Sequence, residues 1–236
     1  MKILVCISSV PDTTSKINFT ADKSAFDKNG IQWVINPYDE FALTKAVKLQ
    51  ESQGATVTIA TVGDAATEAV MRKALAIGAN DAIRVNTEPK DSITVAKELA
   101  KIVEEGGYDL VLCGKESIDY NGGMVPGMLA GLLGFNFVND CIGIEISGTE
   151  ATTIREIDGG KETATSSLPL IIAGKNIEKY FILKNIEAPV GGEANQNVIW
   201  VEAIPKEEGA GFTKIMLGLI ENKLSVMKIV DAFEHI

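Results

Sequence analysis

The chain has 236 residues, of which 46% are hydrophobic and 23% are charged, and its formal net charge at pH 7 is −10. This composition is typical of a globular chain with one large core, or with one core and an appendage. The acidic balance argues against general binding to nucleic acid or anionic lipid, because both need concentrated Lys and Arg. A protein or small-ligand partner is favoured.

The first expected element is a short strand at Lys2–Ile7. Its apolar run is far too short for a signal peptide or a membrane span, so we expect no direct membrane insertion. The cysteines Cys6, Cys113 and Cys141 lie far apart in apolar settings. This pattern favours buried thiols over a disulfide framework or a metal site, and it predicts a reducing cytoplasm.

Strand and helix signals then alternate along the chain. Short β-branched or apolar runs predict strands at Thr56–Val62, Ala82–Val85 and Leu110–Cys113. Helices with apolar residues at helical spacing are expected at Tyr38–Glu51, Ala65–Ile77 and Asp91–Glu105. Because crossovers between parallel strands are nearly always right-handed, we expect an α/β fold with a doubly wound, mostly parallel sheet.

Two segments depart from this alternation. Pro11–Val34 carries apolar residues around a polar turn, which predicts a β-hairpin excursion before the first long helix. After a helix at Met124–Leu133, the chain becomes β-rich as far as Ile172.

The C-terminal part has a different composition. Glycine and polar residues are frequent from Pro189, and a strand at Val198–Ile204 and a helical stretch near Phe212–Phe233 are expected to follow. We therefore predict an α/β nucleotide-binding domain at 1–188 and, at 189–236, a C-terminal arm that packs on a partner subunit.

The polar loop from Gly114 to Gly123 is the most informative part of the sequence. It follows an apolar strand, contains paired glycines and leads into a helix. Glycines let backbone N–H groups approach an anion closely, and a helix N-terminus favours negative charge. The spacing matches neither the P-loop nor the Rossmann fingerprint, so a nucleotide site and an ordinary strand-to-helix connection both stay open.

Two polar residues near this loop also allow two interpretations. Asn36 precedes a proline and two acids, which is a helix-start signal, but it also lies where open α/β folds bind ligands. Asp119 can accept hydrogen bonds from a ribose or cap the following helix.

The sequence lacks the usual sets of residues for covalent or metal chemistry. His235 is the single histidine and the cysteines are scattered. They supply no Ser-His-Asp, Cys-His or metal-ligand set. We expect no catalytic residues and no metal site.

Several separated motifs carry a family resemblance. They are Lys2–Val5, Asn36–Glu40, Arg72–Ala79, Gly114–Asp119, Arg155–Gly160 and Leu168-Pro169. With these motifs in this order, the chain resembles the β subunit of electron-transfer flavoprotein (ETF) as far as about Lys175. The resemblance implies a fold of the adenine-nucleotide-binding type and a heterodimer with an ETF α subunit. It also implies an FAD held mainly by the α subunit and an AMP bound structurally in the β subunit.

The resemblance also implies the nucleotide contacts, carried over by position. They are Cys6, Asn36, Val62, Gly114, Lys115, Glu116, Ser117, Ile118, Asp119, Tyr120, Asn121, Gly122, Gly123, Met124 and Val125. In the assumed strand order the first and fourth strands are neighbours. Cys6 and Gly114 would then flank the topological switch point, where such folds bind ligands.

The implied function is electron transport, as in fatty acid oxidation. The flavin would take electrons from acyl-CoA dehydrogenase-type donors and pass them to a membrane quinone oxidoreductase, while the protein supplies position and electrostatics. Members of the family present an apolar side chain to the donor, and Ile182 or Leu183 would serve here.

Three alternatives stay open. In an electron-bifurcating member the β subunit would hold its own FAD, although Asn121–Gly127 lacks the acidic, threonine-containing run associated with such members. A universal-stress-type nucleotide-binding regulatory module would form a stable homodimer without an α partner. An ATP-dependent adenylating or sulfur-transfer enzyme needs a pyrophosphate loop after its first strand, and Ser8–Pro11 does not supply one.

Overall fold

The computed structural model describes part of the chain in full and part as strand backbone. Residues 1–175 and 177 are described in full, and strands are described at 184–185, 198–203, 213–220 and 223–231. The chain divides into two compact units, Met1–Glu178 and Lys179–Ile236. The boundary predicted at residue 188 lies outside the described residues and stays a prediction.

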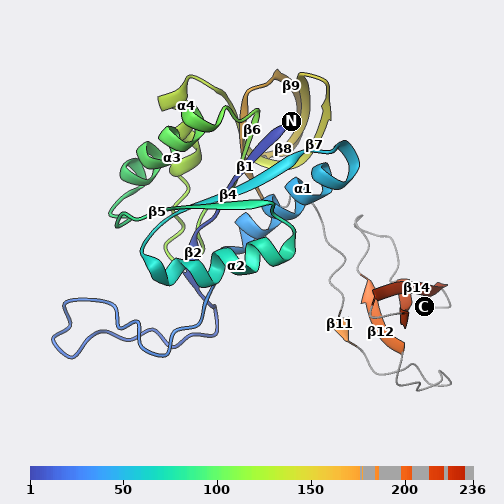
Figure 1. The fold of residues 1–236 in the computed structure, drawn as a ribbon, viewed down its shortest axis with the longest axis horizontal. Helices are drawn as coiled ribbons and strands as arrows, with labels where there is room; N and C mark the ends of the chain where they lie inside the picture. Colours follow the sequence, from blue (N-terminus) through green and yellow to red (C-terminus); the bar gives the residue numbers. More distant parts are fainter. Residues whose placement is uncertain (176, 178–183, 186–197, 204–212, 221–222, 232–236) are drawn as a thin grey trace. The chain divides into compact units, whose positions relative to one another are not determined.

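A mostly parallel sheet forms the centre of the first unit (Figure 1), and its strand order is β5-β4-β1-β6-β10-β7-β8-β9. The bounds are β1 Lys2–Cys6, β4 Thr56–Val62, β5 Asp81–Val85, β6 Leu110–Gly114, β7 Asn136–Ser147, β8 Glu150–Ile157, β9 Gly160–Ser167 and β10 Leu170–Gly174. The strands from β5 to β7 in this order are parallel, and β8 and β9 are antiparallel. Because β1 lies between β4 and β6, the expected switch point is present.

Helices cover both faces of the sheet (Figure 1). They are α1 Pro37–Gln53, α2 Glu68–Ile77 with the preceding 3-10 turn η1 Ala65–Thr67, α3 Ser92–Gly106 and α4 Val125–Leu133. One core joins Leu43 of α1 and Val70 of α2 to Val5, while a second joins Leu99 of α3 and Leu129 of α4 to the opposite face. Successive strand residues point to opposite faces, so each strand serves both cores. The predicted doubly wound α/β fold is confirmed.

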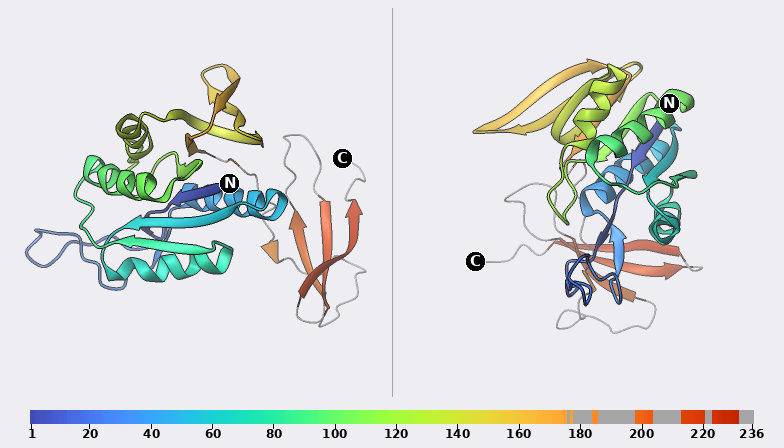
Figure 2. Two further views of the ribbon diagram at one scale, coloured as in Figure 1. Left: turned by 45° about the horizontal axis from the view of Figure 1, so that its top comes forward. Right: turned by 90° about the vertical axis from the view of Figure 1, so that its left-hand side faces the viewer.

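The predicted hairpin excursion is also present. β2 (Ser9–Pro11) pairs antiparallel with β3 (Trp33–Ile35), and the intervening residues 12–32 extend away from the helices (Figure 2). Within this loop Phe19 and Phe26 form an isolated antiparallel bridge. The ring of Phe26 meets that of Trp33 edge-on, at a centroid distance of 6.3 Å.

The second unit contains an antiparallel sheet in the order β11-β12-β13-β14. Its strands are β11 Lys184–Asn185, β12 Val198–Ala203, β13 Thr213–Ile220 and β14 Lys223–Asp231. The strand expected at Val198–Ile204 is confirmed as β12, but the helical stretch expected near Phe212–Phe233 is wrong. Short apolar runs do not distinguish helix from strand by period alone, and the Ile and Val residues here favour strands.

Among the helices that the structure describes, none combines the length and the apolarity that a membrane crossing needs.

All three cysteines are buried and free, as expected from the sequence. Contact with the Cys6 thiol, together with burial, raises the pKa of Cys113, and burial raises the pKa of Cys141. Because the thiolate is the reactive form, these thiols should react slowly in the native protein.

We expect a chromogenic disulfide reagent at pH 7.5 to titrate the three thiols only after unfolding. The measurement compares the absorbance of the coloured thiolate that the reagent releases in buffer with that in guanidinium chloride. Rapid release from the native protein would show that solvent reaches the thiols in the folded state.

Candidate functional site

A cleft of about 870 Å³ lies at the carboxyl edge of the parallel strands. Its lining includes residues that follow four strands: Ser8 and Ser9 after β1, Gly63 and Asp64 after β4, Asn86 and Thr87 after β5, and Glu116 and Ser117 after β6. This is the edge at which open α/β folds bind ligands. The volume lies within the range of cofactor sites, roughly 300–1,000 Å³.

The cleft gathers many of the residues that the sequence assigned to a nucleotide. Those that line it are Cys6, Val62, Gly114, Glu116, Ser117, Asp119, Tyr120, Gly122 and Val125. The remaining ones, which are not part of the lining, are Asn36, Lys115, Ile118, Asn121, Gly123 and Met124. Except for Asn36 they belong to the same loop and helix start. That these residues touch a nucleotide stays a prediction.

Asn36 supports the loop after β6. Its side chain makes no capping hydrogen bond to α1. Instead Nδ2 donates to the carbonyl oxygen of Glu116 at 2.9 Å, and Oδ1 accepts from the amide of Ile118 at 3.2 Å. Its own amide donates to the carbonyl oxygen of Ser8 at 2.9 Å. The side chain of this almost fully buried residue therefore shapes the loop rather than capping the helix.

Replacing Asn36 by Ala should loosen this loop while α1 stays intact. Two hydrogen bonds to half-buried backbone groups are lost, at a cost of about 1 kcal/mol each. Hydrogen exchange should become faster at Glu116–Ile118. Asp91→Ala is the control, because Asp91 caps α3 by accepting from the Thr94 amide at 2.7 Å. It should speed exchange at the start of α3 and not in the loop.

Asp39 joins the ends of β1 and β6. Its Oδ1 accepts from the Gly114 amide at 2.8 Å, while Oδ2 accepts from the Ser8 amide at 2.8 Å and from the Ser8 hydroxyl at 2.6 Å. The residue is 5% exposed. Desolvation raises the pKa of this carboxyl to about 6, although the hydrogen bonds from Ser8 and Gly114 act in the opposite direction.

Sequence reasoning missed Asp39 and Ser8 as parts of the site. Asp39 stands in the first turn of α1, where an acid is common because it complements the helix dipole. The sequence does place Asp39 at the carboxyl edge of the sheet, where it could contribute to a site. An acid that only stabilises the start of a helix would occupy the same place, so this position alone does not identify a site residue.

Among the glycines of the loop, Gly114 is required by its close packing against α1. A Cβ at Gly114 would lie 2.4 Å from Asp39 Oδ1, and one at Gly122 would lie 2.3 Å from the Tyr120 ring. At Gly123 it would lie 3.1 Å from the carbonyl oxygen of Lys115. The amide of Ser117 closes the loop by donating to the carbonyl oxygen of Gly122 at 3.1 Å.

The loop presents polar groups that a ligand can satisfy. Among the described residues, the hydroxyl of Ser117 is buried without a hydrogen-bond partner, a costly arrangement unless another molecule supplies one. Asp119 is part of the lining and accepts from the neighbouring Tyr120 amide at 3.1 Å. It does not cap α4, since the N-cap residue there is Met124. Of its two interpretations, the ribose contact is the one that stays open.

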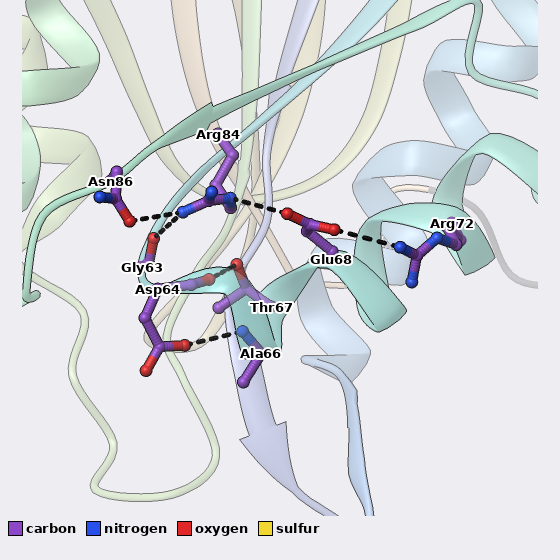
Figure 3. Close-up of polar contacts among 8 residues, drawn as sticks. All are labelled: Gly63, Asp64, Ala66, Thr67, Glu68, Arg72, Arg84 and Asn86. Carbon is purple, nitrogen blue, oxygen red and sulfur yellow. Dashed lines mark hydrogen bonds and ion pairs between the residues drawn. The ribbon is translucent and has the colours of Figure 1, made fainter.

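Arg84 holds the part of the cleft formed by the residues that follow β4 and β5 (Figure 3). This side chain donates to the carbonyl oxygen of Gly63 at 3.0 Å and to Asn86 Oδ1 at 2.7 Å, and its Nε lies 3.5 Å from Glu68 Oε1. Next to it Asp64 Oδ1 accepts from the Ala66 amide at 2.9 Å. These contacts fix the ends of β4 and β5 relative to the start of α2.

Carboxylates dominate the charge of the cleft. The acidic residues of the lining are Asp39, Asp64, Glu88, Asp91, Glu116 and Asp119, and Lys28 is the cation among the described lining residues. Carboxylates accept hydrogen bonds from ribose hydroxyls. A phosphate would have to rely mainly on backbone N–H groups. The carboxylate acceptors therefore fit the hydroxyls of a nucleotide sugar, and a phosphate would be held by N–H donors of the loop backbone.

The fold and the cleft define a doubly wound α/β protein with a ligand site at its topological switch point. Residues 24–175 match the family model described as "Electron transfer flavoprotein domain". The chain therefore belongs to the electron transfer flavoprotein family, and its relatives there are beta subunits. The resemblance seen in the sequence is confirmed.

Relatives named as beta subunits are similar over most of their length. The "Electron transfer flavoprotein subunit beta" of Bacillus subtilis is 34% identical over 193 residues, which cover 79% of this chain and 74% of the relative. That of Dictyostelium discoideum is 32% identical over 247 residues and 97% of both chains. The mitochondrial protein of Oryza sativa subsp. japonica is 34% identical over 195 residues, 79% of this chain and 77% of the relative.

Proposed function

We propose that the chain is the β subunit of a heterodimeric electron-transfer flavoprotein, with AMP bound in its switch-point cleft and an FAD held mainly by an α subunit. The names of the relatives support the subunit assignment. The observation that supports AMP is the cleft itself, which is lined by both Ser117, with its unpartnered hydroxyl, and Asp119.

In this proposal the residues of the chain bind and orient, and they carry no covalent chemistry. Glu116 and Asp119 accept hydrogen bonds from ribose hydroxyls, Ser117 Oγ pairs with a polar atom of the nucleotide, and the backbone at Gly122 and Val125 meets the phosphate. FAD supplies the redox chemistry when it is bound. The subunit is thus an electron carrier rather than an enzyme.

The electron partners in this proposal are acyl-CoA dehydrogenase-type donors and a membrane quinone oxidoreductase as acceptor, as in fatty acid oxidation. Ile182 and Leu183, the proposed donor-docking residues, lie outside the described residues. A cytoplasmic location is proposed from the free thiols. The name of the rice relative places that protein in mitochondria.

Co-expression with an ETF α-type chain tests the assignment. We expect a one-to-one complex with the visible absorption of oxidised flavin, which bleaches when an acyl-CoA and its dehydrogenase are added. A colourless homodimer of this chain, with no affinity for the α-type chain, would overturn the proposal.

A further inference from the structure

We propose that Asp39 is a positioning residue for the nucleotide, because its carboxylate clamps the carboxyl ends of β1 and β6 and so sets the shape of the switch-point cleft. This inference rests on the proposed function, since it assigns a role within the same site. The Asp39 clamp comprises the Asp39 carboxylate together with the Ser8 and Gly114 groups that bond to it.

The clamp lies where direct pairing of the two strands has ended. The ladder between β1 and β6 runs from Ile3 with Leu110 to Val5 with Leu112. Ser8 and Gly114 lie beyond its last pair, at the point where the crevice opens. Asp39, from the first turn of α1, links Gly114 at the end of β6 to Ser8, two residues beyond β1, by hydrogen bonds to both. The position of one strand end relative to the other therefore depends on this side chain.

The clamp needs both carboxylate oxygens of Asp39 as hydrogen-bond acceptors. Oδ1 accepts from Gly114, and Oδ2 accepts from both the amide and the hydroxyl of Ser8. A carboxylate offers two acceptor oxygens, whereas the amide of Asn offers one oxygen and one NH₂ donor. In an Asn variant the NH₂ group would face a backbone N–H that cannot accept. The isosteric amide therefore does not replace the carboxylate.

The surroundings of Asp39 favour a role beyond packing. Among the described residues its carboxylate meets hydrogen-bond donors from Ser8, just after β1, from Gly114 of β6 and from the side chain of Asn36, and no cation pairs with it. The Cys113 thiol lies near the Asp39 carboxylate, Tyr38 precedes Asp39 in the chain, and β4 and β10 contribute no titratable side chain. Across the contact with α2, Lys73 pairs with the neighbouring Glu40. A buried charge without a counter-ion is costly, so an apolar residue would serve simple packing better.

The Gly114–Gly123 loop depends on the clamp for its direction. Gly114 is the last residue of β6 and the first of this loop, and Asn36, three residues before Asp39, bonds to Glu116 and Ile118 further along it. Displacing Gly114 would therefore shift the buried Ser117 hydroxyl and the Asp119 carboxylate within the cleft. The clamp acts on the nucleotide through these groups and does not itself have to touch it.

The test uses the purified αβ complex, depleted of AMP and still loaded with FAD, and measures AMP affinity by calorimetry. Asp39→Asn should raise the Kd for AMP by about tenfold or more, since hydrogen bonds to a charged group are lost. Ser8→Ala should raise it severalfold, and Ser8→Thr, which keeps the hydroxyl, should restore affinity to near the wild-type value. In the Asp39→Asn background Ser8→Ala should add little, because the two residues act as one unit.

Asp109→Asn is the matched control. Asp109 Oδ2 accepts from the Lys2 amide at 2.7 Å and so joins the same two strands at their amino ends, away from the cleft. The substitution removes the same formal charge and one exposed hydrogen bond between the two strand starts, and AMP affinity should be unchanged. Equal Kd values for wild type, Asp39→Asn and Ser8→Ala would overturn the clamp, as would an equal loss in Asp109→Asn.

Failure of the proposed function gives a different result. If the wild-type complex does not bind AMP, the proposed nucleotide is wrong, and the clamp is then judged by hydrogen exchange. Asp39→Asn must speed exchange across Gly114–Gly123 while Asp109→Asn leaves it unchanged, and equal exchange in both would overturn the clamp. If Asp39→Asn does not fold, the comparison of Ser8→Ala with Ser8→Thr decides.

Discussion

Gly114→Ala should destabilise the protein by about 3 kcal/mol and weaken nucleotide retention, because the added methyl group overpacks a fully occupied position. Its Cβ would lie 2.4 Å from Asp39 Oδ1, 2.6 Å from Tyr38 Cβ and 2.9 Å from the Asp39 amide nitrogen. Two of these atoms belong to or adjoin the backbone of α1, so they cannot turn aside as the end of a flexible side chain can. The strand end and the first turn of α1 would have to separate.

The matched control is Gly131→Ala in α4. No atom lies within 4 Å of a Cβ built at Gly131. Alanine is the better helix former, and it should stabilise the protein by roughly 0.5–1 kcal/mol. Denaturant titrations of both variants, followed by circular dichroism, measure the difference. Similar stabilities for the two variants would show that the close contact at Gly114 is absent in solution.

The second large effect is the dependence of stability on pH that Asp39 creates. Its pKa in the folded chain is raised to about 6 from the ordinary 3.8, chiefly by desolvation. Between these values the folded state binds this proton and the unfolded state does not, so the free energy of unfolding rises as the pH falls through 6 toward 4. At pH 5 the gain over pH 7.5 should be about 1.4 kcal/mol, and the full shift corresponds to ~3 kcal/mol.

Asp39→Asn isolates this contribution. The variant cannot titrate at residue 39, so the difference between wild type and variant in the free energy of unfolding should change by about 1.4 kcal/mol from pH 7.5 to pH 5. The carboxyls with lowered pKa values, such as those of Asp12, Asp91 and Glu156, lose their contribution only at lower pH. Urea titrations at several pH values provide the measurement. A difference that stays constant across this range would mean that Asp39 titrates normally.

Much of the first unit follows from its sequence because the signals there are local. The apolar runs at Thr56–Val62 and Leu110–Cys113 each lie between segments with helical spacing, and right-handed crossovers then restrict the strand order. The strands after Phe212 were not predicted, because the apolar residues there fit the spacing of a helix as well as that of a strand. What decides its structure is pairing with β12, a contact that the sequence does not display.

The site was predicted in part for the same reason. The loop from Gly114 to Gly123 is recognisable by its glycines and its place after a strand. The roles of Asn36 and Asp39 depend on contacts with Glu116 and Gly114, which lie 80 and 75 positions away in the chain. Locally both residues look like an ordinary helix start, so their use as supports of the loop emerges only when α1 packs beside β6.

The nucleotide in the switch-point cleft can be identified by acid denaturation of the purified αβ complex, followed by chromatographic quantification of the released nucleotides. We predict one FAD and one AMP for each heterodimer, with a lower AMP content in the Asp39→Asn complex and an unchanged one in Asp109→Asn. Two FAD and no AMP for each heterodimer would contradict the AMP assignment and would assign the cleft to a second flavin.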